Sequence, residues 1–434
     1  MKRSVAFKTL GCRLNQYETD ALASEFNGGG YDVVDFDAPA DVYVINTCTV
    51  TSQSDQKSRQ AINKAARGGK DPVVVVTGCM AKQHRESLEA QDFVTYVVEN
   101  EHKTSIFPLV EAHYRKEILH PVHQTTDLFG YRSVDTSSRT RSFIKIQDGC
   151  DNLCTFCIIP FVRGLAVSRP VQDIVDNAVD VLEAGYKELV ITGVNIGRYD
   201  SEGVGLDGLL SRIVALPGDF RVRISSIEPD GFTDAFFEML EHPKVMPHLH
   251  LCLQSGSERV LRRMRRMYTA EQFMRMVERI RGRLPDFNFS TDIMVGFPGE
   301  TEQDFEDSLA VCRQAAFSHI HTFKYSIRTG TRAERMDDQV PEPVKKERSV
   351  AVRALAESMK LSYLERWADR DESMLVERIR DGRAWGYGRH FIPIETDAQG
   401  LEYNQVVPVR IEQLATDGVT VLHAKARNST MAIT

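Results

Sequence analysis

The sequence predicts a multidomain α/β protein with an N-terminal parallel α/β sheet domain, a partial TIM-type barrel and a small antiparallel β-barrel at its C-terminal end. At 434 residues the chain is too long for one ordinary domain, so two or three domains are expected, each with its own core. Apolar β-rich runs alternate with helical patterns through most of the chain, which favours parallel sheets covered by helices. After residue 373, short β runs separated by turns replace this alternation, as expected for a small barrel.

The first third of the chain contains five apolar runs typical of strands. These runs are SVAFKTLG, YDVVDF, DVYVINT, PVVVVTG and FVTYVVEN, and helices are expected near residues 15–26, 58–66 and 84–90. Cys12, Cys48 and Cys79 each directly follow one of these runs, in LGC, NTC and TGC. Because the carboxyl ends of parallel strands lie on one edge of a sheet, these cysteines are predicted to converge where open α/β folds bind ligands.

Three thiols in equivalent positions favour a metal site, because this third of the chain has no other cysteine. The alternative is that each is a small buried residue, since cysteine is among the most buried residue types. With only three protein ligands, an iron–sulfur cluster at this edge would keep one iron open to an exogenous group.

A second set of three cysteines lies within eight residues, at Cys150, Cys154 and Cys157. The spacing Cys-x3-Cys-x2-Cys can hold three corners of a four-iron cluster and leave one iron without a protein ligand. The alternatives are chance clustering and a structural zinc knuckle, although zinc takes four ligands and no second Cys or His pair follows closely. The segment resembles the signature of radical S-adenosylmethionine (SAM) enzymes, in which an aromatic residue, here Phe156, precedes the third cysteine. The resemblance implies that the open iron binds SAM.

The middle of the chain continues with six βα units, which suggests a partial TIM-type barrel with its ligand face at the strand carboxyl ends. Polar residues stand where these strands give way to loops. Those expected to line a SAM pocket together with Phe156 are Thr192, Asn195, Ser226, Glu228 and Gln254. For any single one of them, a turn or helix-cap role is the alternative.

Four other residues of this region have plainer interpretations. Gly296 and Gly299 would let the backbone approach a ligand closely, but a strand-to-helix turn explains them equally simply. Cys252 and Cys312 are interpreted as core residues, because the first alternates with apolar neighbours and the second lies in a helical pattern.

The formal net charge of −7 argues against a nucleic-acid partner, but the charge is unevenly distributed. Residues 258–283 contain nine Arg and three Glu, a local charge of +6, in what is expected to be one arginine-rich helix. Such a face can bind phosphates, with Arg262 and Arg263 as candidate RNA contacts, and a solvated amphipathic helix is the alternative. No apolar run approaches the roughly 20 residues of a membrane span, and no signal-peptide pattern starts the chain, so a cytoplasmic protein without a membrane partner is expected.

The C-terminal segment is expected to follow a charged helix that runs from residue 344 to about residue 370. Within the predicted barrel, Trp385 and Arg389, with Tyr387, His390 and Phe391, are candidates for stacking on bases and binding phosphates of single-stranded RNA. Seven basic residues meet seven acidic ones between 373 and 434, so electrostatics alone does not predict RNA binding there.

The whole chain resembles the methylthiotransferase family, whose members combine N-terminal methylthiotransferase, radical SAM and TRAM domains. The motifs that carry the resemblance include LGCRLNQYETD, NTCTVT, TGCMA, GCDNLCTFCIIPFVRG, RISSIEP, LQSGS, MRRMYT and TDIMVGFPGET. It implies a methylthiotransferase domain at 1–130, a radical SAM core at 136–371 and a TRAM-like RNA-binding barrel at 373–434. Residues 15–19 and 49–51 look most like the branch that acts on threonylcarbamoyladenosine at tRNA position 37. The branches that act on isopentenyl-adenosine or on a ribosomal-protein aspartate usually differ there.

The resemblance also implies a mechanism with two [4Fe-4S] clusters and two SAM molecules. The Cys150, Cys154 and Cys157 cluster would cleave SAM to a radical, and the Cys12, Cys48 and Cys79 cluster would supply or carry the sulfur that a second SAM methylates. The methylthio group would replace hydrogen at the adenine C2. The implied partners are the anticodon loop of tRNA and an electron donor such as flavodoxin or ferredoxin. The rival hypotheses are a radical SAM methyltransferase or lipoyl-type sulfur inserter acting on a protein, and a non-enzymatic iron–sulfur RNA-binding or sensor protein.

Overall fold

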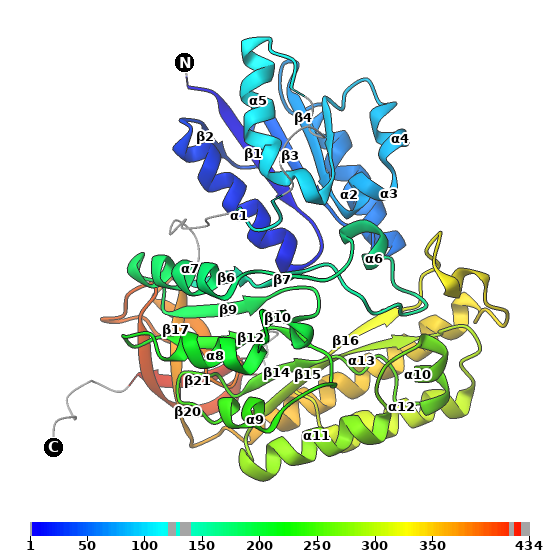
Figure 1. Ribbon diagram of the computed structural model, residues 1–434. Coiled ribbons are helices and arrows are strands. Elements are labelled where there is room, and N and C mark those ends of the chain that lie inside the picture. The colour runs from blue at the N-terminus through cyan, green and yellow to red at the C-terminus, as the bar shows by residue number, and fades with distance from the viewer. Residues whose placement is uncertain (1, 120–126, 131–139, 416–420, 427–434) are drawn as a thin grey trace.

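The computed structural model describes residues 2–119, 127–130, 140–415 and 421–426. Figure 1 shows an N-terminal sheet domain above a barrel of strands and helices, with a smaller C-terminal barrel beside it. This architecture confirms the predicted fold class. The expected domain boundary between 130 and 136 lies mostly outside the described residues, and the first strand of the small barrel begins at Asp371, two residues before the expected boundary at 373.

The N-terminal domain is a five-stranded parallel sheet with the strand order β2-β1-β3-β4-β5. Its strands are β1 (Ser4–Thr9), β2 (Asp32–Val34), β3 (Val42–Thr47), β4 (Val73–Gly78) and β5 (Tyr96–Val98). Its helices are α1 (Arg13–Gly28), α2 (Ser52–Ala65), α3 (Cys79–Gln83), α4 (Arg85–Glu89), the 3-10 helix η1 (Asn100–Ser105) and α5 (Ile106–Arg115). Strands β3 and β4 are buried along their whole length, because helices pack on both faces of the sheet.

The partial barrel consists of two parallel sheets with the strand orders β12-β9-β6 and β13-β14-β15-β16. Its strands are β6 (Arg141–Lys145), β9 (Glu188–Thr192), β12 (Arg221–Ile224), β13 (Ser226–Ile227), β14 (His248–Leu251), β15 (Asn288–Val295) and β16 (His319–Lys324). Its covering helices are α7 (Val171–Glu183), α8 (Leu206–Val214), α9 (Asp234–Leu240), α10 (Glu258–Met264), α11 (Ala270–Arg283) and α12 (Glu302–Ala315). Its short elements are β7 (Gln147–Asp148), α6 (Ile159–Arg163), β8 (Val167–Ser168), η3 (Ile196–Arg198), β10 (Asp200–Ser201), β11 (Val204–Gly205) and η4 (Arg332–Arg335).

Side chains of the barrel strands alternate between the covering helices and the barrel interior. Leu249 and Leu251 of β14 belong to the main hydrophobic core under the helices. His248 and His250 of the same strand, and Arg223 of β12, line cavities on the opposite side. The barrel interior is therefore polar, which suits a ligand site.

The arginine-rich segment forms two helices, so the expectation of one helix over 258–283 is wrong. Helix α10 ends before Arg265, which adopts a left-handed conformation with a φ of 59°. Thr269 then caps α11 by accepting a hydrogen bond from the Gln272 amide. Because of the break at Arg265, the arginines of α10 and those of α11 lie in different surroundings.

Helix α13 (Glu342–Glu365) leads into a closed barrel with the strand order β17-β18-β19-β21-β20. Its strands are β17 (Asp371–Arg380), β18 (Arg383–Gly388), β19 (Pro393–Asp397), β20 (Val406–Ala415) and β21 (Val421–Ala426). Four of the five strand pairs are antiparallel as predicted, and the β19–β21 pair is parallel. Among the helices of the described ranges, none is long and apolar enough to span a membrane.

Candidate functional site

Two short strands close the loop that carries Cys150, Cys154 and Cys157. Strands β7 and β8 pair antiparallel at its two ends, and α6 lies within it. Gly149 has a φ of 70°, and a Cβ there would lie 1.9 Å from the carbonyl oxygen of Leu165. Only glycine therefore fits at the point where the loop closes.

The end of α10 holds the same loop from the other side. The Thr155 hydroxyl donates a 3.0 Å hydrogen bond to the Arg263 carbonyl oxygen. Arg266 donates from Nη1 to Cys154 Sγ at 3.2 Å, and its Nη2 pairs with the Glu228 carboxylate at 2.9 Å. The helix break at Arg265 thus brings a guanidinium directly onto a cysteine sulfur.

The three thiols of this loop are unsuited to act as free nucleophiles. Burial is the main cause that raises the pKa of Cys150, Cys154 and Cys157, and it raises the pKa of Cys157 to about 12. Without a metal these side chains are protonated at neutral pH, because their pKa values lie above it. A metal stabilises the thiolate form outright, so the buried sulfurs suit metal ligation.

The structure brings Cys12, Cys48 and Cys79 together at the carboxyl edge of three neighbouring strands, β1, β3 and β4. Cys12 is the N-cap of α1, and Cys79 is the first residue of α3. Gly11 has a φ of 93°, and a Cβ at this residue would lie 2.8 Å from Cys48 Sγ. Glycine before the first cysteine therefore lets the β1–α1 turn pack directly on the second one.

The exposure of these three cysteines differs. Cys48 and Cys79 are buried, whereas Cys12 is exposed. Burial raises the pKa of Cys48, and it raises the pKa of Cys79 to about 11. Two of the cysteines are thus held inside the domain, and the third is exposed.

The two cysteine sets meet across helix α6. Cys79 packs against Ile158 and Val162, which follow Cys157 in the chain. Asn100 donates a 2.7 Å hydrogen bond to the Val162 carbonyl oxygen from beside Cys79. Figure 1 shows α6 between the N-terminal domain and the barrel. The first cysteine set therefore lies next to the loop that carries the second.

A buried ion network joins the two domains beside these cysteines. The Glu18 carboxylate pairs with Lys103, with Lys145 at 3.1 Å and with Arg163 at 3.1 Å. Lys145 and Arg163 also pair with Asp148, at 2.6 and 2.9 Å. All five side chains are at most 1% exposed. Because Glu18 and Lys103 come from the N-terminal domain and the other three from the barrel, the network fixes how the domains meet.

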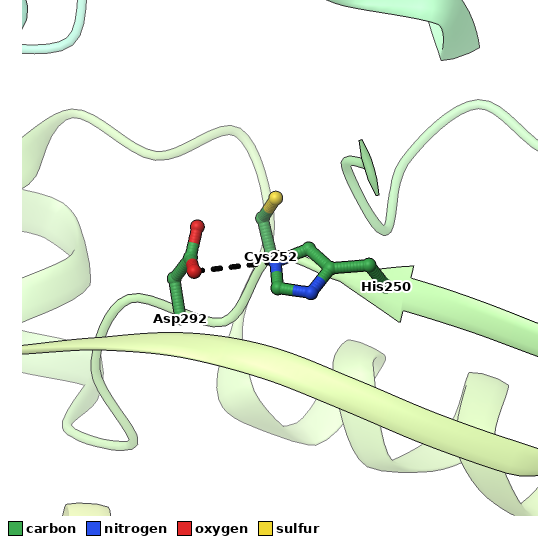
Figure 2. Close-up of side chains that lie close together, drawn as sticks. All are labelled: His250, Cys252 and Asp292. Carbon is green, nitrogen blue, oxygen red and sulfur yellow. Dashed lines mark ion pairs between the residues drawn. The ribbon is translucent and has the colours of Figure 1, made fainter. Parts of the chain in front are cut away.

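Within the described ranges, the six cysteines belong to no group compact enough for a single metal ion. The group with ligand atoms within 4.8 Å of one another is His250, Cys252 and Asp292. Figure 2 shows these side chains together, with His250 Nε2 at 3.2 Å from the Asp292 carboxylate. Cys252 is half-buried there rather than in the hydrophobic core, so its interpretation as a core residue is wrong, whereas Cys312 is buried in the core as expected.

The loop that carries Cys150, Cys154 and Cys157 fits an iron–sulfur cluster with an open iron. Its three thiols are buried or half-buried, and the backbone and a guanidinium hold the loop in place.

Two of the candidate SAM residues adjoin the second cysteine set. Asn195 interacts with the Cys150 thiol, and this interaction opposes the rise in pKa that burial causes. Its Oδ1 atom is buried without a hydrogen-bond partner among the described residues, as expected for a group that awaits a ligand. Glu228 accepts a 2.7 Å hydrogen bond from Asn152 of the cysteine loop. Asn195 and Glu228 were predicted from the sequence, whereas Asn152 and Arg266 were not.

The other four candidates stay predictions. Three of them rest on their place at strand ends, and Phe156 rests on the resemblance of the cysteine segment to the radical SAM signature. Thr192 is buried at the end of β9, and Ser226 is exposed at the start of β13. Gln254 has a φ of 68°, and its backbone N–H donates a hydrogen bond to the Asp292 backbone carbonyl oxygen at 2.9 Å. Phe156 packs edge-on against the ring of Phe297, with a centroid distance of 6.3 Å.

Comparison with known proteins agrees with this geometry. Residues 4–99 match the uncharacterized protein family UPF0004, and residues 144–312 match the radical SAM superfamily. The threonylcarbamoyladenosine tRNA methylthiotransferase MtaB of Bacillus subtilis is 42% identical over 423 residues, covering 94% of this chain and 93% of the relative. The protein of the same name from Thermotoga maritima is 35% identical over 425 residues, covering 96% of each. The chain belongs to the radical SAM tRNA methylthiotransferase family, in its MtaB branch.

The barrel also resembles a solved radical SAM structure. The radical SAM methyltransferase TsrM from Kitasatospora setae superposes with a TM-score of 0.55 at 16% identity, covering 74% of this chain and 73% of that one. At this identity the similarity concerns the fold. This methylthiotransferase is a radical SAM enzyme, and its family uses SAM and [4Fe-4S] clusters.

The methylthiotransferase has a basic hollow beside the loop that carries Cys150, Cys154 and Cys157. A cavity of about 450 Å³ is lined by Thr155, Met336, two aspartates and five arginines, and the arginines are Arg262, Arg263, Arg265, Arg332 and Arg335. Arg262 is exposed, whereas Arg263 donates a 3.1 Å hydrogen bond to the Pro298 carbonyl oxygen and packs on Gly299. Arg262 and Arg263 were predicted from the sequence, whereas Arg332 and Arg335 of η4 were not, because they are distant from the first two in the chain.

The GFPG turn at residues 296–299 contains two glycines that lie against other side chains. Gly296 and Gly299 have φ values of 72° and 78°, and a Cβ at Gly296 would lie 2.3 Å from the Lys345 side chain. Both therefore form a turn that other side chains cover, which is the simpler of the two interpretations.

The candidate RNA contacts of the C-terminal barrel lie mostly against the radical SAM barrel. Phe391 stacks on both Tyr387 and His248 with centroid distances of 4.7 Å, and the Arg223 guanidinium lies 4.9 Å from its ring centroid. Arg389 donates to a carbonyl oxygen of the radical SAM barrel, that of Pro243, at 3.0 Å. These side chains join the two domains, a role that no local sequence pattern predicts.

Two more of these candidates are engaged within the same region. His390 pairs with Glu372 at 2.7 Å. Trp385 is half-buried, and the Arg378 guanidinium lies 4.4 Å from its ring centroid. RNA contacts by Trp385 and Arg389 stay predictions.

Proposed function

We propose that this radical SAM enzyme inserts a methylthio group at C2 of threonylcarbamoyladenosine at position 37 of the tRNA anticodon loop. The observation that carries the proposal is the meeting of two three-cysteine sets across α6. Each set leaves one cluster position without a protein ligand. The named activity of the relatives at 42% and 35% identity supports the same reaction.

The two cysteine sets have separate roles in this proposal. Cys150, Cys154 and Cys157 would hold a [4Fe-4S] cluster, which when reduced would supply one electron for cleavage of SAM to methionine and a 5′-deoxyadenosyl radical. Radical chemistry is needed because the C2–H bond is unreactive. Asn195 and Glu228 position SAM beside that loop. Cys12, Cys48 and Cys79 hold the second cluster, which carries the sulfur that another SAM methylates. An electron donor such as flavodoxin or ferredoxin supplies the electrons in a cytoplasmic setting.

The first test removes the sulfur-carrying site. In a variant with Cys12, Cys48 and Cys79 replaced by alanine, SAM cleavage should continue while methylthio product falls below detection, because only the other set generates the radical. Release of 5′-deoxyadenosine and nucleoside mass spectrometry of the tRNA measure the two outcomes. Methylthio product from this variant would rule out a sulfur role for the N-terminal set.

A second test concerns how tRNA binds. Substitution of both Arg262 and Arg335 by alanine should weaken tRNA binding and lower its salt slope by roughly 0.7–0.9 per lost phosphate contact. Arg263 is unsuitable because it also supports the Pro298 turn. The matched control is Arg275→Ala, which removes an exposed arginine that pairs with Glu271 on α11. Equal salt slopes for the double variant and the wild type would mean that the arginines of this hollow do not contact phosphates.

The substrate branch has its own test. The alternatives are an isopentenyl-adenosine tRNA, a ribosomal-protein aspartate, or a radical SAM methyltransferase or lipoyl-type sulfur inserter acting on a protein. Nucleoside analysis of tRNA from a deletion strain should show loss of the methylthio form of threonylcarbamoyladenosine with the unmethylthiolated form retained. Loss of methylthio-isopentenyl-adenosine instead would assign the enzyme to another branch.

A further inference from the structure

Two adjoining cavities occupy the space between the barrel strands and the C-terminal barrel. The larger has a volume of about 1030 Å³ and the smaller of about 270 Å³. Both are lined by Arg13, Glu377 and Phe391. The larger one extends to the polar face of β14, β15 and β16 and also has apolar lining from the C-terminal barrel. Arg13 enters both cavities from the N-terminal domain.

Arg13 is the residue that follows Cys12, at the first position of α1. Its side chain keeps a large accessible surface although protein surrounds it on most sides, as expected for a group that extends into a cavity. Arginine side chains stay protonated in proteins, so the chain holds a positive charge beside these cavities.

Two carboxylates near Arg13 each pair with another arginine. Glu188 accepts hydrogen bonds from Arg223 at 2.6 and 3.2 Å. Glu377 accepts one from Arg141 at 2.9 Å. In the described part of the chain, the Arg13 side chain has no hydrogen bond and no ion pair. Among the residues that line the two cavities, the cations Arg13, Arg141, Arg223, Lys360 and Arg378 outnumber the carboxylates Glu357 and Glu377, so the lining carries an excess of positive charge.

An unpaired guanidinium next to a cavity indicates a site for one anionic group. Arg13 keeps an accessible surface toward the cavity, and a planar guanidinium can bind a carboxylate or phosphate through two parallel hydrogen bonds. The threonylcarbamoyl group, which is attached to N6 of the adenine, ends in a free carboxylate. C2 and C6 belong to the same six-membered ring, so a base whose C2 reaches the cluster at Cys12 also brings its N6 substituent close to the neighbouring residue.

We propose that Arg13 binds the carboxylate of the threonylcarbamoyl group and so selects this substrate over tRNA adenosines that lack it. The inference rests on the proposed function. A tRNA phosphate offers the same oxyanion chemistry, and the experiment separates the two sources.

The test compares two anticodon stem-loop RNAs, one with threonylcarbamoyladenosine as the free acid and one with its methyl ester. The wild-type holoenzyme should bind the acid about 10- to 100-fold more tightly than the ester, since a charge-assisted pair is lost. Arg13→Gln should bind the acid as weakly as the wild type binds the ester, with ester binding unchanged. Arg13→Lys should restore part of the preference. The matched control, Arg115→Gln, removes a surface arginine that pairs with Glu111 and should behave as the wild type.

Iron content, measured for each variant, checks that the neighbouring Cys12 site stays loaded, and Arg13→Lys replaces Arg13→Gln in the comparison if the latter loses iron. Equal weakening of acid and ester by Arg13→Gln would mean that Arg13 contacts a phosphate, and no preference in the wild type would mean that the carboxylate is not recognised. Either result overturns the inference. Failure of the wild type to methylthiolate either RNA would instead overturn the proposed function.

Discussion

Replacement of Cys150, Cys154 and Cys157 by alanine should abolish SAM cleavage completely and leave about half of the iron in the reconstituted protein. The remaining iron should belong to the Cys12, Cys48 and Cys79 set, because the two sets come from separate domains and each has its own loops. Iron and sulfide analysis, together with release of 5′-deoxyadenosine under reducing conditions, measures both effects.

The matched control for this variant is Cys312→Ala. Cys312 is buried in the barrel core and belongs to neither set, so its loss should keep all of the iron and all of the SAM cleavage. If the triple variant lost all of its iron, the six cysteines would form one shared site, and the proposed division of roles would be wrong.

The positions of the cysteines were accessible to sequence reasoning because they follow from local rules. A parallel strand ends at the same edge as its neighbours, so Cys12, Cys48 and Cys79 could be placed together without knowing any long-range contact. The same rule predicted polar residues at barrel strand ends, and it placed Asn195 beside the cysteine loop.

Contacts between domains were not accessible in this way. Arg13, Arg163 and Phe391 acquire their surroundings only when separate domains dock, and no local pattern encodes which charge or ring they will meet. A single left-handed residue, Arg265, decided that the arginine-rich segment forms two helices and that Arg266 reaches a cysteine sulfur. Such a break is a local backbone choice that composition does not reveal.

The buried ion network is the strongest candidate for holding the two cysteine sets in a fixed relation. Burial alone would raise the pKa of Glu18, but Arg163, Lys103 and Lys145 lower it well below its ordinary value. Arg163 also donates a hydrogen bond to the Asn15 side-chain oxygen at 2.6 Å, and it interacts electrostatically with Cys79 and Cys12. One carboxylate from the N-terminal domain is therefore the partner of three cations, two of which belong to the barrel.

Substitution of Glu18 by glutamine should destabilise the docking of the two domains by about 3–5 kcal/mol, because removal of one partner leaves buried cations uncompensated. The expected result is faster hydrogen exchange in α1 and α6 and reduced methylthio product, with SAM cleavage less affected because the Cys150 loop is also held by α10. Hydrogen exchange is the appropriate readout, since a chain of several domains does not unfold in one step. The control is Glu89→Gln, which removes a surface pair with Arg85 and should cost at most about 1 kcal/mol.

The pH dependence of the same variant tests whether charge is the cause. Because the pKa of Glu18 is lowered in the folded protein, its contribution to stability is fully present above the unfolded value of about 4.3 and is lost as the pH falls through the folded value. The difference in exchange rate between wild type and Glu18→Gln should therefore be constant from pH 8 to about pH 5 after correction for intrinsic exchange, and it should shrink at lower pH as the wild-type carboxylate becomes protonated. A difference that persisted unchanged in acid would mean that glutamine disturbs packing, and the network would then not be what couples the two cysteine sets.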